Sequence, residues 1–468
     1  MGSLCSSDNN TRTHAITLLQ SPNHEQWADF LSLVKNPTEN KMVVILVLSD
    51  EERKELIKET SLGAYVTVEN PKESVPPVEA SGPPDPQIQI NPKQNAALGA
   101  ILGAFLGDSI GSYLEFKPSV TEGEAVTALK MPGGGCFNVS PGQVTDDSEL
   151  ALSLGYGLIK GEGQLNLDQI AYYYGFWMNS SPFDMGGTTS TGLQGLGIAQ
   201  QNMRATERDV DGLARNHAFT DALQKNGNSL SNGGLMRLTP MCIWARNLCE
   251  QDLERAIGIE QSFTHSNHIA HLGAITYAMA IGHLINNPKD SAGALKKVDD
   301  YIQSKQPSFH VDEIVRWWGS AKSKNAQLMP ATDNIGFMKI AWTYSFIFLK
   351  RISAQGNDYD YLKVIKEVIK AGGDTDTNAC IVGGMVGAYF GYDLLPKNQL
   401  DILLKLDASQ AARKRPSIYS PGNAKKMALK LFDLSPKNLD GLPDNTLLTR
   451  QICGECMKSG AKSEEGVK

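Results

Sequence analysis

Four glycines recur at every fourth position of one long apolar segment, at Gly99, Gly103, Gly107 and Gly111. Residues four apart lie on the same face of an α-helix, so the segment predicts a helix with one face almost free of side chains. A second backbone or a ligand can approach such a face closely. We therefore expect a helix that begins near Asn95, a suitable N-cap residue, and that packs tightly against another helix.

A membrane span is the alternative interpretation, because the stretch from Ala96 to Leu114 approaches transmembrane length. The ionisable Asp108 inside the stretch and its glycine face favour a packed helix of a soluble protein. The 468 residues and the 41% hydrophobic content suffice for one large domain with appendages.

The charge and the cysteines limit the partners and the compartment. A formal net charge of −7, without evident clusters of Lys and Arg, argues against a nucleic-acid partner. Seven cysteines are scattered along the chain, and no secretory signal sequence opens it. We expect a reducing, cytoplasmic location.

Residues 1–11 predict a flexible terminus that carries an acylation pattern. Gly2 and Ser6 fit the N-myristoylation pattern, and Cys5 is available for palmitoylation. Two acyl chains would anchor the protein stably at a membrane surface, whereas one chain would not. An accidental match to so short a pattern is the alternative, and both interpretations stay open.

Residues 12–70 predict a small α/β domain, whose role the sequence does not indicate. Apolar, β-prone runs predict strands at 15–19, 42–48 and 65–68, with helices between them. Residues 71–93 are rich in proline, which cannot sustain a helix or a central strand, so they predict a linker.

Residues 94–435 predict a mostly helical domain, because long segments rich in Ala, Leu, Ile and Gly have helical spacing there. A polar tail, 436–468, follows and carries Cys453 and Cys456. One Cys-x-x-Cys without a second pair or a nearby His is weak evidence for zinc, so a solvated tail is favoured.

Asp108 lies in the glycine-bearing segment, and Glu115 follows seven residues later. A helix that continues for two turns would place both carboxylates on one face, although two exposed acids are the alternative. The same segment contains a Gly-x-Ser-x-Gly pattern around Ser109. A serine hydrolase needs a strand before that pattern, and the preceding residues lack strand character.

Two further acidic clusters occur at predicted helix starts. Residues 145–147, Thr-Asp-Asp, begin one helix, where capping alone would also explain adjacent acids. Residues 372–377, Gly-Gly-Asp-Thr-Asp-Thr, lead into another. They do not form a calcium loop, which needs Gly and Glu where this chain has Ala379 and Met385. If the clusters meet, their hard oxygen ligands suit two magnesium or manganese ions that activate water.

In these motifs the chain from about Gln94 to Leu434 resembles the ADP-ribosylglycohydrolase family. The resemblance implies an all-α orthogonal helical bundle, here preceded by the small α/β domain. It also implies two Mg²⁺ ions, with Mn²⁺ as a substitute, and places Glu115 at the edge of the metal site. The metal ligands that it implies are Thr145, Asp146, Asp147, Asp374, Asp376 and Thr377.

Three weaker matches to the family point to the substrate pocket. Asn232, Gly233 and Gly234 resemble a turn whose backbone N–H groups reach a diphosphate. His265 resembles the family's Thr-His step. Asp184 lies in a loop similar to that of the branch acting on ADP-ribosylated arginine, where it would accept a guanidinium. An ordinary Asn-Gly turn, a helical face of histidines and a solvated loop are the respective alternatives.

The implied function is Mg²⁺-dependent removal of ADP-ribose from protein side chains or small conjugates, with arginine slightly favoured. Metal-activated water would attack the anomeric carbon of the ribose, with Glu115, Asp146 or Asp147 as the base. A catalytically inactive ADP-ribose-binding or structural protein of the same fold is the alternative, although none of the clustered carboxylates is missing. The sequence indicates neither the linkage nor the oligomeric state.

Overall fold

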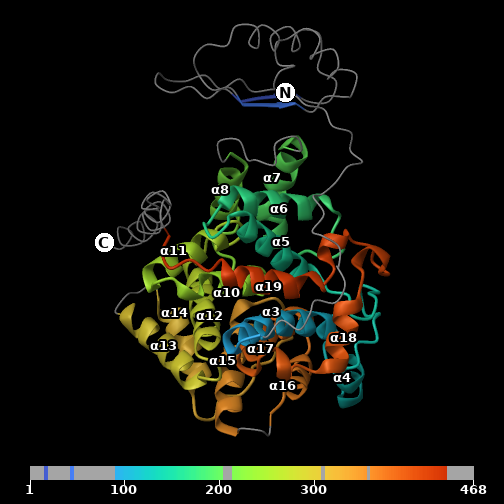
Figure 1. The fold of residues 1–468 in the computed structure, drawn as a ribbon, viewed down its shortest axis with the longest axis vertical. Helices are drawn as coiled ribbons and strands as arrows, with labels where there is room; N and C mark the ends of the chain where they lie inside the picture. The colour runs from blue at the N-terminus through green and yellow to red at the C-terminus, as the bar shows by residue number, and fades with distance from the viewer. Residues whose placement is uncertain are drawn as a thin grey trace, which may run out of the picture. The chain divides into compact units, whose positions relative to one another are not determined.

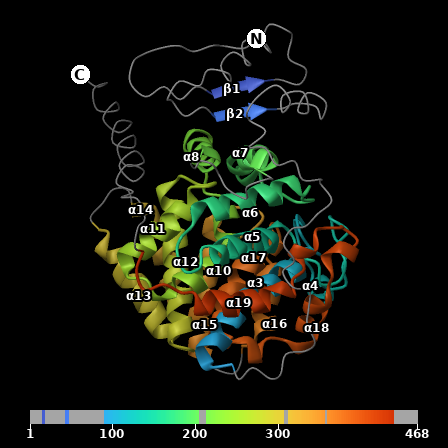
Figure 2. The ribbon, with the colours of Figure 1, turned by 45° about the horizontal axis from the view of Figure 1, so that its top comes forward.

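The computed structural model describes residues 15–18, 43–46, 90–203, 213–306, 311–355 and 359–439. Two short strands, β1 (Ala15–Leu18) and β2 (Val43–Leu46), pair in parallel (Figure 2). Both lie within apolar runs that predicted strands. The other elements predicted between residues 12 and 70, the acylation at Gly2 and Cys5, and the Cys-x-x-Cys of the tail lie outside the described residues.

The remainder of the described chain is helical (Figure 1), and no β-strand occurs in it between residues 90 and 439. The all-α prediction for this part is therefore confirmed. Its α-helices, in chain order, are α3 (Pro92–Gly111), α4 (Glu122–Ala128), α5 (Asp146–Lys160), α6 (Leu167–Asn179), α7 (Gly187–Met203), α8 (Leu213–Lys225), α9 (Gly233–Met236), α10 (Thr239–Trp244), α11 (Glu250–Gln261), α12 (His268–Asn286), α13 (Ser291–Ser304), α14 (Asp312–Lys322), α15 (Met338–Gln355), α16 (Tyr361–Ile369), α17 (Thr375–Phe390), α18 (Lys397–Lys405) and α19 (Asn423–Asp433). Short 3-10 turns are η3 (Ala245–Asn247), η6 (Tyr392–Leu394), η7 (Ala408–Gln410) and η8 (Ser417–Tyr419).

Helix α3 begins one turn earlier than the sequence predicted. The N-cap is Asn91, whose side chain and that of Gln94 exchange hydrogen bonds with each other's backbone N–H, and Pro92 takes the first helical position. This capping box is a stronger start signal than Asn95 alone, so the last two residues of the predicted linker are helical. Asn95 instead accepts a hydrogen bond from the N–H of Asp393 at 3.1 Å.

The glycines of α3 let this helix lie against the backbone of α17 (Figure 1). A Cβ atom on Gly103 would lie 2.4 Å from the carbonyl oxygen of Gly383, and one on Gly107 would lie 2.0 Å from that of Ala379. Real side chains do not reach such distances, so only glycine allows this helix separation. The close contact places Asp108, next to Gly107, beside the N-terminus of α17.

Helix α12 is long and apolar enough to cross a membrane, judged by length and composition alone. In this structure 78% of its most apolar 18-residue window is buried inside the helical body. It packs against α10, α11, α13 and α17. This burial is typical of the core helix of a globular domain.

Candidate functional site

Carboxylates from three distant segments meet near the ends of α3, α5 and α17. Oxygens of Asp108, Asp147 and Asp376 all lie within 4.8 Å of one another, and so do oxygens of Glu115, Asp374 and Asp376. All five side chains are buried, and Asp376 belongs to both groups. The structure thus brings together the three acidic clusters that the sequence pointed to.

The route by which Glu115 reaches the cluster differs from the prediction. Helix α3 ends at Gly111, so Asp108 and Glu115 do not share the face of one helix. The chain turns after Gly111, and the N–H of Phe116 donates to the carbonyl oxygen of Gly373 at 2.8 Å. This backbone contact ties the turn that bears Glu115 to the glycines before α17.

Asp108 caps α5 from a different helix. Its carboxylate accepts hydrogen bonds from the N–H and hydroxyl groups of Thr145, at 3.0 Å each, and from those of Ser148. Thr145, the N-cap residue, provides no side-chain cap of its own. Burial raises the pKa of Asp108 to about 7, while these hydrogen bonds lower it. Since donors already occupy its oxygens, Asp108 positions the cluster at 145–147.

Asp147 and Asp376 each keep one buried oxygen, Oδ1 and Oδ2 respectively, without a hydrogen-bond partner. The other oxygen of Asp147 lies 3.0 Å from the hydroxyl of Thr145, which Asp108 also contacts, and that of Asp376 accepts from the N–H of Thr377 at 2.8 Å. Burial and neighbouring carboxylates raise the pKa of both acids well above the usual range. Buried carboxylate oxygens without donors are costly, and a divalent cation between them would remove that cost.

Glu115, Asp146 and Asp184 form the outer edge of the cluster. Burial, with the negative charge of Asp184, raises the pKa of Glu115 to about 11. Burial raises the pKa of Asp184 to about 6 and that of Asp146 well above its usual range. The negative charge of Asp184 contributes to the raised pKa of Asp146, so these two carboxyl groups are neighbours. The predicted catalytic residues and Asp184 therefore lie in one acidic site.

The turn predicted to bind a diphosphate adjoins this cluster. The side-chain amide of Asn232 donates to Oδ2 of Asp374 at 2.7 Å. A Cβ atom on Gly233 would lie 2.8 Å from the hydroxyl of Thr189, and one on Gly234 would lie 2.1 Å from the side-chain oxygen of Gln261. A larger residue at either position would have to displace one of these side chains, and the contact with Thr189 shows that the start of α7 reaches the same turn.

His265 lies beneath this turn. Its ring nitrogens are 2.7 Å from the hydroxyl of Ser231 and 2.8 Å from that of Thr264. Burial lowers the pKa of His265 to about 3, so the ring is neutral near pH 7. Both nitrogens bond to protein groups, and the ring supports the turn. Its contact with a substrate stays a prediction.

The sequence reasoning missed two buried ion pairs that hold the site. Arg237 donates to Glu260 at 2.7 Å, and a further guanidinium N–H donates to the carbonyl oxygen of Gly233 at 3.0 Å. Arg415 pairs with Glu149 of α5 at 2.8 Å. A single Arg in an apolar run, such as Arg237 between α9 and α10, is a sequence signal for such a pair.

We expect the substitution Arg237→Met to lower the free energy of unfolding by about 3–5 kcal/mol, because Glu260 would remain as a buried charge without its partner. Urea denaturation followed by circular dichroism measures this change. Lys296→Met is the control, since the pair of Lys296 with Asp300 is exposed and contributes less than about 1 kcal/mol. Equal losses in the two variants would contradict a stabilising role of the buried pair.

Ser109 lies within α3, and its hydroxyl is buried without a hydrogen-bond partner. A serine-hydrolase nucleophile needs a strand before it and a sharp turn at the serine. A helix surrounds Ser109 instead, so the geometry does not support the serine-hydrolase alternative.

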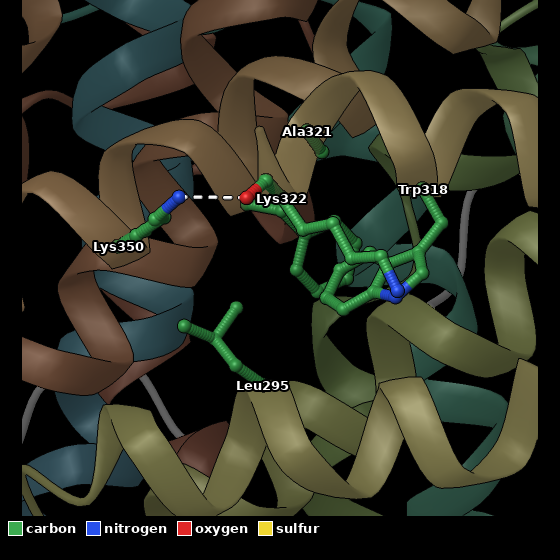
Figure 3. Close-up of a pocket in the computed structure, with 6 residues that line it drawn as sticks. Leu295, Trp318, Ala321, Lys322 and Lys350 are labelled. Carbon is green, nitrogen blue, oxygen red and sulfur yellow. Dashed lines mark hydrogen bonds between the residues drawn. The ribbon is translucent and has the colours of Figure 1, made fainter. Parts of the chain in front are cut away.

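A separate apolar pocket of about 140 Å³ lies where α13, α14 and α15 meet (Figure 3). Its lining residues are Leu295, Trp318, Ala321, Lys322, Phe346 and Lys350. The ammonium group of Lys350 donates to the backbone carbonyl of Lys322 at 2.7 Å. The lining contains no carboxylate, so this pocket is distinct from the acidic site.

The sequence profile of ADP-ribosylglycohydrolases matches residues 90–435, which include every residue of the acidic site. The chain belongs to the ADP-ribosylglycohydrolase family. Members of this family are hydrolases that release ADP-ribose, and the buried carboxylates lie in the part of the chain that the family shares.

Relatives named for this activity cover most of the ADP-ribosylglycohydrolase domain. A protein of Acanthamoeba polyphaga mimivirus that is named an ADP-ribosyl glycohydrolase is 30% identical to this chain, over 68% of this chain and 94% of its own length. The ADP-ribosyl-[dinitrogen reductase] glycohydrolase of Rhodospirillum rubrum is 25% identical to this chain, over 66% of this chain and 90% of its own length. A solved structure, titled an ADP-ribosylglycohydrolase-related protein complex, has 20% identity and a TM-score of 0.52, and covers 73% of this chain and 99% of its own. It supports the fold.

Proposed function

We propose that this ADP-ribosylglycohydrolase removes ADP-ribose from modified protein side chains and that its carboxylates hold two divalent cations, Mg²⁺ or Mn²⁺. The observation that carries the proposal is the pair of buried oxygens without donors, Oδ1 of Asp147 and Oδ2 of Asp376, in a site of oxygen ligands only. Hard oxygen ligands without sulfur or imidazole nitrogen fit these two metals.

The residues that would hold the cations are Thr145, Asp146, Asp147, Asp374, Asp376 and Thr377. Divalent cations bound there would supply a water molecule of lowered pKa. The hydrogen bond from Asn232 fixes the carboxylate of Asp374. Glu115 is our candidate for the base, because it lies at the edge of the cluster within 4.8 Å of Asp374 and Asp376. Asp146 and Asp147 are the alternative bases.

The position of Asp184 favours arginine as the modified residue. Asp184 is only partly buried, lies at the edge of the cluster and contacts Asp146. A carboxylate in this place can accept a guanidinium through two parallel hydrogen bonds. The relative from Serratia proteamaculans, 24% identical over 66% of this chain and 75% of its own length, is named an ADP-ribosylarginine hydrolase.

Release of ADP-ribose from proteins modified at arginine or at serine tests the function directly. We expect release in the presence of Mg²⁺ or Mn²⁺, with faster turnover of the arginine linkage. Binding of ADP-ribose without release from any substrate would instead identify an inactive ADP-ribose-binding protein. Faster turnover of the serine linkage would contradict the assignment of Asp184.

Metal removal gives a separate prediction. We expect EDTA to abolish turnover and added Mg²⁺ to restore it. Mg²⁺ at a hundred times its dissociation constant should also raise the free energy of unfolding by about 2.7 kcal/mol, because it binds the folded state alone. Thermal unfolding with and without Mg²⁺ measures this effect without reference to activity. Full turnover in EDTA, with no thermal shift in Mg²⁺, would refute the metal site.

A further inference from the structure

Three phenylalanine rings lie beside the acidic edge of the site. Phe116 directly follows Glu115, and Phe183 directly precedes Asp184. The ring of Phe137 lies between them, with centroid distances of 6.3 Å to Phe116 and 5.7 Å to Phe183. The rings therefore form a continuous row next to two of the carboxyl groups.

Phe116 lies at the surface end of this row, whereas Phe137 and Phe183 are half-buried. Phe116 is 54% exposed, although large apolar residues are usually buried. The backbone φ angle at Phe116 is +60°. Positive φ angles are rare for bulky residues, and they concentrate where a fold holds groups ready for a ligand.

Arg413 lies at the end of the row. Its guanidinium carbon is 5.2 Å from the ring centroid of Phe183, its side chain is exposed, and no acidic residue of the described ranges pairs with it. The backbone of Arg413 is fixed, because it donates to and accepts from the side-chain amide of Gln143. Gln143 lies two residues before Thr145, so Arg413 is attached to the chain that leads into the acidic site. We call Phe116, Phe137, Phe183 and Arg413 the aromatic rim.

We propose that the aromatic rim binds the polypeptide around the ADP-ribosylated side chain, and that Arg413 favours modified sites with a neighbouring acidic residue. Phenylalanine and arginine are enriched at protein interfaces, and an exposed guanidinium pairs well with a carboxylate. The rim adjoins Glu115 and Asp184, whereas the turn proposed to bind the diphosphate contacts Asp374. The polypeptide part and the ADP-ribose part of the substrate would therefore contact different residues.

This inference rests on the proposed function, and three substrates test it. Two are ADP-ribosylated peptides that differ only in having two Glu or two Lys residues beside the modified arginine. The third is free ADP-ribosylated arginine, which has no flanking residues. For the unmodified enzyme we expect kcat/KM to be about fivefold higher for the Glu peptide than for the Lys peptide, as one exposed ion pair allows. Arg413→Glu should reverse this preference.

The matched control is Lys414→Glu, which makes the same charge change at an exposed neighbour that lacks the ring contact. It should keep the preference for the Glu peptide. Phe137→Ala, checked for folding by circular dichroism, should raise KM for both peptides relative to free ADP-ribosylated arginine. An unchanged preference in Arg413→Glu, or an equal shift in Lys414→Glu, would overturn the inference.

Two other results separate the inference from the function beneath it. A proportional loss of activity of Arg413→Glu on all three substrates would place Arg413 at ADP-ribose itself and overturn the role of the rim. No release from any substrate by the unmodified enzyme, with Mg²⁺ or Mn²⁺ present, would refute the proposed function.

Discussion

Replacement of Asp376 by alanine is expected to reduce the release of ADP-ribose by about 10³-fold, the loss that follows from several kcal/mol of missing transition-state stabilisation. Asp376 is the one residue of both acidic groups, so its removal would disrupt both cation sites. Measurement of kcat/KM on the preferred linkage gives the loss, and calorimetric titration with Mg²⁺ gives the change in metal affinity.

The fold should tolerate this substitution. Alanine removes one hydrogen bond, from the N–H of Thr377, but also removes an acid that burial and the charges of Glu115 and Asp374 disfavour. The free energy of unfolding of the metal-free protein should therefore change by less than about 1 kcal/mol. Asp401→Ala, the same change on the exposed face of α18, is the control and should keep activity and Mg²⁺ binding. Full activity of Asp376→Ala would refute the site assignment.

The local structure of two acidic clusters, 145–147 and 372–377, could be predicted because each lies at a helix start with a distinct local signal. Thr145 and the acids after it are suited to an N-cap and first turn, and the structure begins α5 at Asp146. The glycine pair before Asp374 predicts a sharp turn, and both glycines have φ near +70°. Such signals act over a few residues, so they can be read from the sequence.

The partners across the molecule could not be predicted in this way. The cap that Asp108 provides for α5 spans 37 residues, and the pair of Arg415 with Glu149 spans 266. The periodicity of a sequence reports on neighbours within a few residues, so it cannot predict contacts between residues so far apart in the chain. The end of α3 at Gly111 was also missed, because the apolar pattern continues to Leu114 while the chain has already turned towards Gly373.

The glycine face of α3 connects the local pattern to the site. Its spacing of four residues predicted a tightly packed helix, but the sequence did not identify the neighbour. The structure shows that this neighbour is α17, whose own Gly383 and Gly387 face the glycines of α3. The separation of these two helices determines how closely Asp108 and Asp376 approach each other, so the glycines have a role in the site as well as in the core.

Gly107→Ala is accordingly expected to lower the free energy of unfolding by about 3 kcal/mol, at the upper end of the usual cost of overpacking. The added methyl group would lie 2.0 Å from the carbonyl oxygen of Ala379 and 2.8 Å from the backbone nitrogen of Cys380, and backbone atoms cannot move aside as a flexible side chain can. The helices must separate at the turn that bears Asp108. We therefore also expect weaker Mg²⁺ binding in the protein that remains folded.

Two further glycines make this prediction specific. Gly319→Ala, at an exposed position of α14 with no atom near the added methyl group, should raise the free energy of unfolding by about 0.5–1 kcal/mol, because alanine favours the helix more than glycine. Gly103→Ala should destabilise the fold as Gly107→Ala does, but it lies one turn farther from Asp108 and should weaken Mg²⁺ binding less. Urea denaturation and calorimetry compare the three variants. Equal Mg²⁺ affinities of Gly103→Ala and Gly107→Ala would show that the helix separation does not control the geometry of the acidic site.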